Sequence, residues 1–248
     1  MTISTALFLL AAGFLSGVVN AIAGGGTFLT FGAMTIIGLP PISANATSSI
    51  AQFPGYITST LAYWTDIKRN LRSATLFAVV SALGALLGAS ILLLLDNNAF
   101  RAIVPWLLLA ATALFAAGPL LKPKQTVEGV PSRKIGAAVQ FLTSIYGGFF
   151  GAGMGIMMLA SLGLTERSND YHRLNALKNL LAVVIAAMAI VVFAAGGVVN
   201  WLCAAVLIPA VALGGYAGVW LAKRLPQILV RCAVVVIGIV LAIYYFVT

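Results

Sequence analysis

Charged residues are scarce in this chain, and they are unevenly placed. Only 8% of the 248 residues are Asp, Glu, Lys or Arg, whereas 62% are hydrophobic. An ordinary soluble domain carries roughly 25% charged residues. No charged residue occurs before Asp66, and uncharged stretches recur at 73–95, 102–121, 135–165 and 179–222. Because about 20 apolar residues cross a bilayer as a helix, the sequence predicts an all-α, polytopic membrane protein and excludes a water-soluble surface.

Carboxylates, cysteines and histidines are also few. The chain has 5 Asp and Glu residues, and they lie outside the predicted spans or at their ends. An intramembrane aspartyl protease or a carboxylate proton relay is therefore not supported. The 2 cysteines and 1 histidine form no cluster with the spacing of a metal site, and no phosphate-binding loop ends in Lys-Ser/Thr. We expect no enzyme, no cofactor and no metal.

The basic excess is best explained by membrane topology. The 14 Lys and Arg residues give a net charge of +9, and basic residues gather in the loops that stay in the cytoplasm. We therefore expect no nucleic-acid partner. A signal peptide begins with a positive region, which is missing here, so residues 1–23 are predicted to be a retained membrane helix.

The chain consists of two copies of one unit. Five residue pairs share one spacing of 130 residues: Asn45 and Asn175, Ala46 and Ala176, Gly84 and Gly214, Gly88 and Gly218, and Arg101 and Arg231. The long hydrophilic loop falls between the two copies. We predict a first transmembrane repeat at 1–121, a cytoplasmic linker at 122–134 and a second transmembrane repeat at 135–248.

Apolar runs and helix breakers predict the helices of both repeats. In the first repeat they are 3–23, a short helix over 27–38, and then 43–65, 73–95 and 101–121. In the second they are 135–151, a short helix over 155–164, and then 174–195, 200–222 and 226–247. At 1.5 Å per residue the two short helices cannot cross a bilayer.

The basic loops decide between two topologies. If each glycine-broken pair is a hairpin, loops 66–72, 122–134, 165–173 and 222–225 share one side, and every basic residue except Arg101 lies in or beside them. If each broken pair crosses once, this asymmetry largely disappears, so the positive-inside rule favours hairpins. Each repeat then has three spanning helices plus a hairpin, which inverts the second repeat and places both termini outside. Inverted repeats with broken helices are typical of secondary transporters.

Matched polar residues predict the position of a substrate site. Asn45, Ser48 and Ser49 share one helix face. Their counterparts are Asn175, Lys178 and Asn179. Polar side chains within a membrane face the bundle interior or an aqueous cavity. Lys178 has two interpretations that the sequence leaves open, a counter-charge for an anion or a lysine that snorkels to the cytoplasmic interface.

The glycine clusters 24–26 and 153–155 are predicted to interrupt helices inside the membrane. A half-helix that starts at such a break presents backbone N–H groups to a cavity and attracts negative charge, and Thr27 adds a hydroxyl. The glycine pairs spaced by four, 84/88 and 214/218, are instead expected to let helices pack closely. Asn20 and Gln52 are weaker cavity candidates, because they would serve equally well in interhelical hydrogen bonds.

Several motifs together resemble one known family. Gly17-Val-Val-Asn-Ala-Ile-Ala-Gly-Gly-Gly-Thr27 is followed by Gly38-Leu-Pro-Pro41 and Ala44-Asn-Ala-Thr-Ser48, and the second repeat has Gly148-Phe-Phe-Gly-Ala-Gly-Met-Gly155 and Asn175-Ala-Leu-Lys-Asn179. Over nearly the whole chain these stretches resemble the TauE/SafE sulfite exporter family of membrane permeases. The resemblance implies a permease for sulfur-containing or small organic anions in a bacterial plasma (inner) membrane. It also implies that both glycine-rich turns and the segments after them line the path.

We therefore predict a secondary transporter of small anions that works by alternating access. A passive anion channel and a non-transporting membrane scaffold subunit are the alternatives. The predicted partners are a small anionic substrate and the lipid bilayer, and a homo-oligomer is left open. The predicted substrate-binding residues are Gly24, Gly25, Gly26, Thr27, Asn45, Thr47, Ser48, Gly153, Gly155, Asn175, Lys178 and Asn179.

Overall fold

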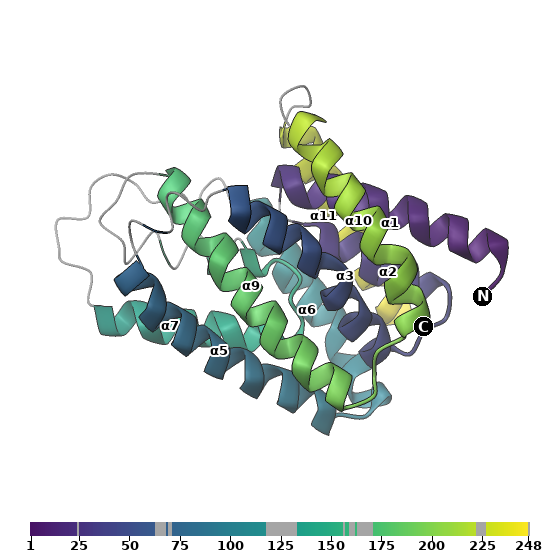
Figure 1. The fold of residues 1–248 in the computed structure, drawn as a ribbon. Coiled ribbons are helices and arrows are strands. Elements are labelled where there is room, and N and C mark those ends of the chain that lie inside the picture. Colours follow the sequence, from purple (N-terminus) through teal and green to yellow (C-terminus); the bar gives the residue numbers. More distant parts are fainter. Residues whose placement is uncertain are drawn as a thin grey trace.

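The protein is a bundle of α-helices (Figure 1). Its structure, a computed structural model, describes residues 1–23, 25–62, 68, 71–117, 133–155, 157–158, 162, 171–221 and 227–247. The predicted first repeat contains α1 (Ile3–Ala23), α2 (Gly26–Ile36), α3 (Pro41–Ala62), α5 (Leu71–Leu94) and α6 (Asn97–Ala117). The second contains α7 (Arg133–Phe149), α9 (Tyr171–Ala195), α10 (Trp201–Leu221) and α11 (Gln227–Val247). The all-α prediction is confirmed. Most of the predicted linker and of the second short helix lies outside the described residues.

The outside of the bundle is apolar and the inside holds polar groups. Large apolar side chains such as Leu83, Leu213 and Val240 are exposed, whereas Thr30 and Ser48 are buried. Among the described residues, four segments are long and apolar enough to cross a membrane: Ile3–Ala21, Ala74–Leu94, Ala176–Ala195 and Trp201–Gly218. This distribution is the one expected where lipid, not water, surrounds the protein.

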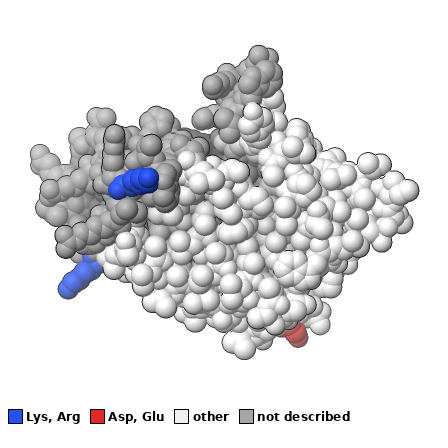
Figure 2. All heavy atoms as spheres, viewed as in Figure 1, with Lys and Arg blue, Asp and Glu red and all other residues white. Residues whose placement is uncertain are grey.

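Exposed charges lie at opposite ends of the bundle. Lys68 and Lys134 are exposed near the starts of α5 and α7, while Asp96 and Arg101 lie where α5 ends and α6 begins. Figure 2 shows the blue side chains at one end of the molecule, the red one at the other, and an uncharged surface between them. The described charges therefore leave a broad uncharged band around the helices, as a bilayer requires.

Corresponding helices of the two repeats pack against each other in opposite directions. In the α6–α11 pair, the Trp106 ring meets the Phe246 ring edge-on at 5.2 Å, and farther along α6 Thr112 lies against Gly238. Residue numbers rise along one helix as they fall along the other, so α6 and α11 are antiparallel.

The α3–α9 pair is also antiparallel. Other contacts join a helix of one repeat to a helix of the other repeat that is not its counterpart. Thr47, near the start of α3, accepts a hydrogen bond from the backbone N–H of Asn200, just after α9 ends, at 3.0 Å. Helix α1 packs on α10, and its counterpart α7 packs on α5. Helix α3 packs on α10, and its counterpart α9 packs on α5. Each repeat therefore completes the packing of the other.

Glycines bring two of these helix pairs into backbone contact. A Cβ at Gly214 would overlap the carbonyl oxygen of Phe14 on α1, and a Cβ at Gly88 would overlap that of Ile145 on α7. Gly84 and Gly218 face the same partner helices closely. The glycine pairs spaced by four thus have the close-packing role expected of them.

Two adjacent glycines on α10 provide a matched test of this packing. Nothing lies within 4 Å of a Cβ built at Gly215, unlike at Gly214. We expect Gly214→Ala to destabilise the protein by about 1–3 kcal/mol through overpacking. Gly215→Ala should leave stability unchanged or raise it by up to about 1 kcal/mol, since alanine favours helix. Thermal unfolding in detergent measures both, and equal melting temperatures would contradict this account of the α1–α10 contact.

Candidate functional site

The first helix break turns the chain back on itself. After α1 ends, Gly26 at the start of α2 lies beside Ser16, ten residues earlier in α1, whose hydroxyl donates to the Gly26 carbonyl at 2.6 Å. A Cβ at Gly26 would overlap the carbonyl oxygen of Ser16, so only glycine fits there. Almost all of α2 is buried. This half-helix is therefore enclosed by protein, which satisfies its backbone ends where lipid could not.

The second break reverses the chain after α7. Gly151 and Gly153 have φ values of +76° and +77°, a conformation that side-chain-bearing residues rarely adopt. The Tyr146 hydroxyl donates to the carbonyl of Ala152 at 2.7 Å, and Met154 returns to lie against Gly147. The sequence placed this break at 153–155. In the structure it begins earlier, at Gly151, and Gly155 already belongs to the resumed helix.

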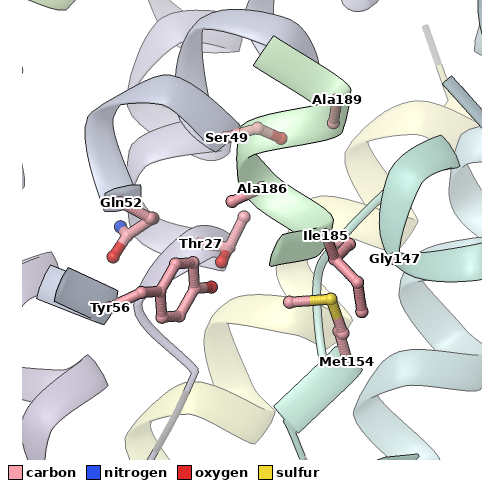
Figure 3. Close-up of a pocket in the computed structure, with 10 residues that line it drawn as sticks. Thr27, Ser49, Gln52, Tyr56, Gly147, Met154, Ile185, Ala186 and Ala189 are labelled. Carbon is pink, nitrogen blue, oxygen red and sulfur yellow. The ribbon is translucent and has the colours of Figure 1, made fainter. Parts of the chain in front are cut away.

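A small pocket lies where the two breaks meet, between the corresponding helices α3 and α9 (Figure 3). Its volume is about 20 Å³, which is room for about one water molecule. The lining residues come from α2, α3, the second break and α9. They are Thr27, Ser49, Gln52, Tyr56, Gly147, Gly151, Met154, Ile185, Ala186 and Ala189.

One part of the pocket wall is backed by a chain of buried hydrogen bonds. The amide nitrogen of Gln52 donates to the Ser16 hydroxyl and, at 3.4 Å, to that of Thr30. The Thr30 and Ser48 hydroxyls are hydrogen-bonded at 2.5 Å. Because Ser16 uses its proton on Gly26, it must accept from Gln52, which fixes the orientation of the Gln52 amide. Its carbonyl oxygen, Oε1, is buried and has no hydrogen-bond partner.

Two hydroxyl groups meet at the pocket. Tyr56 lies one helical turn after Gln52 on α3, and its hydroxyl interacts with the Thr27 side chain. Figure 3 shows the two hydroxyls side by side, with the side chains of Ile185 and Ala186 from α9 also at the pocket. Thr27 belongs to the first turn of α2, where backbone N–H groups lack helical partners. This side of the pocket therefore offers hydrogen-bond donors, and the α9 side is apolar.

Aromatic rings fill the space between the pocket and the end of the bundle at which α11 finishes. Phe150, next to the pocket residue Gly151, meets Phe31 edge-on with ring centroids 5.6 Å apart. Phe31 stacks on Tyr245 at 5.8 Å, and the Tyr245 hydroxyl is hydrogen-bonded to Thr35 at 3.0 Å. All of these side chains are buried, so the pocket is closed on this side.

The predicted residues of the first repeat gather around this pocket in different roles. Thr27 lines it directly, and Gly25 and Gly26 form the break beside it. Asn45 donates from its amide nitrogen to the carbonyl of Phe149 at 2.8 Å and so ties α3 to the second break. Thr47 and Ser48 hold α3 to the start of α10 and to α2 through the hydrogen bonds given above. Gly24 lies outside the described residues.

The predicted residues of the second repeat lie farther from the pocket. Gly153 and Gly155 are in and just after the second break. Lys178 is half-buried on α9 with its Cδ beside Gly155, and Asn179 is buried. The side chain of Asn175 is not among those the structure describes. Tyr56 was not predicted, although the spacing of positions 45, 49, 52 and 56 on α3 places them on one helix face and would have indicated it.

The fold and the pocket define the class: a polytopic helical membrane protein with a small pocket where two helix breaks meet. The chain matches the profile of the family described as Sulfite exporter TauE/SafE over residues 9–245. It belongs to this family, which confirms the resemblance found in its motifs.

Curated relatives agree with this assignment. A probable membrane transporter protein, ORF9, of a Sinorhizobium species is 30% identical over 68% of this chain and 67% of its own. A probable membrane transporter protein of Haemophilus influenzae is 26% identical over 91% of this chain and 88% of its own. The probable membrane transporter protein YfcA of Escherichia coli is 26% identical over 92% and 84%. The chain is therefore a membrane transporter.

The Asn45 hydrogen bond gives a prediction about the second break. Asn45→Ala leaves the Phe149 carbonyl without its partner, and we expect a loss of about 1–3 kcal/mol in stability. The control is Ser49→Ala, one turn along the same helix, because Ser49 donates only to the Asn45 carbonyl of its own helix at 3.1 Å. Denaturation in detergent should separate the two variants. Equal, small effects would show that Asn45 does not hold the break.

Proposed function

We propose that this protein is a secondary transporter of small anions, sulfur oxyanions or organic acids, in a bacterial plasma membrane. The observation that carries the proposal is the meeting of two helix breaks in one buried pocket. In secondary transporters, broken helices that converge inside the bundle form the substrate site. The family description, sulfite exporter, supports a sulfur-containing substrate.

We further propose that the two repeats are inverted relative to each other in the membrane. The antiparallel packing of α3 on α9 and of α6 on α11 supports this arrangement. The contact of α1 with α10 also has a counterpart in the contact of α7 with α5. Contacts of α1 run in the same direction as those of α10, from Gly13 against Leu207 to Gly218 against Val18. The start of α1 and the end of α11 thus share one side, which we assign to the outside.

The charge distribution around the pocket favours an anion. The described helices contain no Asp or Glu, and Thr27 in the first turn of α2 lines the pocket, where the start of a helix favours negative charge. Lys178 lies seven residues before Ile185 on α9, which is about 10 Å along a helix. It stands beside the second break, on the side toward the basic loops. We assign it the role of attracting the anion from the cytoplasmic side.

The small volume of the pocket supports alternating access. A space of about 20 Å³ accepts one water molecule and is too small for an oxyanion with several heavy atoms. Substrate entry therefore requires movement of the helices around the breaks. The aromatic side chains between the pocket and the outer end must separate before substrate can leave in that direction.

A flux assay with Lys178→Ala tests the proposed function. In proteoliposomes we expect wild-type protein to carry sulfite, thiosulfate or a sulfonate at a saturable rate. Lys178→Ala should need roughly tenfold more anion for half-maximal flux, because a lysine about 10 Å from the pocket attracts a unit charge by about 1.7 kcal/mol at an effective dielectric constant of about 20. Lys134→Ala, an exposed lysine at the start of α7, is the control. Equal flux in both variants removes Lys178 from the path, and a rate that does not saturate indicates a channel.

Cysteine labelling tests the inversion of the repeats. Lys68 follows α3, and Ala195 is the last residue of the corresponding helix α9. Both residues are exposed. In a background with Cys203 and Cys232 replaced by alanine, we expect cysteine at 68 to react only from the cytoplasm. Cysteine at 195 should react only from outside. Labelling of both positions from the same side would mean that the repeats are parallel.

A further inference from the structure

A residue that lines the pocket carries a hydrogen-bond acceptor that the protein leaves unsatisfied. Gln52 is 1% exposed, and its Oε1 has no hydrogen-bond partner although its amide nitrogen has two. Rotating the amide would bring Oε1 beside Ser16, whose proton is already used on the Gly26 carbonyl. It would also place Oε1 3.4 Å from the Thr30 hydroxyl, which is already hydrogen-bonded to Ser48. A buried acceptor without a partner is unfavourable. Its persistence in the wall of a pocket indicates that a ligand supplies the missing donor.

The groups around Gln52 have the opposite character. Tyr56 and Thr27 present hydroxyls, and Thr27 belongs to the first turn of α2, so this side suits the oxygens of an anion. Figure 3 shows Gln52 and Tyr56 on the same side of the pocket, with Thr27 facing Tyr56. A complementary ligand therefore has anionic oxygens for one set of groups and an O–H for the other. A fully deprotonated anion has no such O–H.

We propose that the pocket binds a hydrogen oxyanion, a monoanion that retains one O–H group, and that this O–H donates to Oε1 of Gln52. The proposal rests on the proposed anion transport and specifies the form in which the anion is carried. No Asp or Glu in the described helices provides another acceptor for the proton. The proton then crosses the membrane on the substrate itself.

Pairs of ligands that differ only in O–H against CH₃ test this directly. Hydrogen sulfite and methanesulfinate form one pair, in mildly acidic buffer where sulfite retains its proton, and hydrogencarbonate and acetate form a second. We expect purified wild-type protein to bind the O–H member of at least one pair about tenfold to a hundredfold more tightly, because the methyl analogue leaves Oε1 unpaired. Calorimetry or thermal stabilisation measures the ratio of dissociation constants.

The variant Gln52→Met removes the acceptor and keeps the length of the side chain. We expect it to bind both members of the pair equally, within about a factor of two to three. Gln140→Met is the matched control, because Gln140 is also buried and donates to serine hydroxyls, Ser81 and Ser144, away from the pocket. It should keep the wild-type preference. If Gln52→Met does not fold, the wild-type ratio alone decides.

The outcomes separate this inference from the proposed function. Anion binding and flux with no preference for the O–H member would overturn the inference and leave anion transport standing. Equal binding of both members that requires sodium would also overturn it, because a cation would then be the partner of Oε1. If Gln140→Met also loses the preference for the O–H ligand, that preference depends on general packing, and the role proposed for Gln52 is contradicted. Absence of saturable flux for every anion would overturn the proposed function itself.

Discussion

The need to satisfy backbone groups at two helix breaks governs this structure. A break exposes N–H and C=O groups, and lipid offers them no hydrogen bonds. Here each break is enclosed by protein. The Ser16 hydroxyl donates to the Gly26 carbonyl, the Tyr146 hydroxyl donates to the Ala152 carbonyl, and the Asn45 amide donates to the Phe149 carbonyl. Ser16 also accepts a hydrogen bond from Gln52, which lines the pocket, and Tyr146 directly precedes the pocket residue Gly147. The groups that satisfy the breaks therefore adjoin the candidate site.

The glycines around the breaks follow from the same constraint. Enclosing two broken segments requires the neighbouring helices to approach closely. Gly214 of α10 allows backbone contact with α1, and Gly88 of α5 allows backbone contact with α7. Without a hydrophobic driving force between helices in lipid, such close packing is a main source of association. The pairs α1–α10 and α5–α7 can therefore be regarded as a frame around the more polar α2, α3 and α9.

Much of the fold followed from the sequence, because a bilayer imposes long apolar runs. Helix α1 has the predicted bounds, and the other long helices begin and end within a few residues of the prediction. The second break was displaced because its glycines differ: Gly151 and Gly153 take the left-handed conformation, and Gly155 does not. Sequence alone does not distinguish glycines needed for φ from those needed for space.

The site was predictable as a region but not residue by residue. Polar residues of α3 were recognised, yet Asn45 and Thr47 bond to backbone of the other repeat, while Tyr56 lines the pocket. These roles depend on which helix lies opposite, and this is a long-range property that one sequence does not encode locally. Asn45 and Ser49 are one turn apart on α3. Asn45 bonds to Phe149 of the neighbouring segment, whereas Ser49 lines the pocket, and only the packing around α3 distinguishes these two roles.

The magnitudes suggest how such a site could both bind and release an anion. A lysine about 10 Å away attracts a unit charge by about 1.7 kcal/mol at an effective dielectric constant of about 20, which is little more than a tenfold effect. In the proposed function, Lys178 therefore concentrates anions at the second break without holding them. The neutral groups at the pocket then discriminate between ligands, because one unsatisfied hydrogen bond on Gln52 costs about as much free energy as the distant charge contributes. A site built in this way favours a ligand by its pattern of donors and acceptors, and it lets the ligand go once the helices separate and water replaces those bonds.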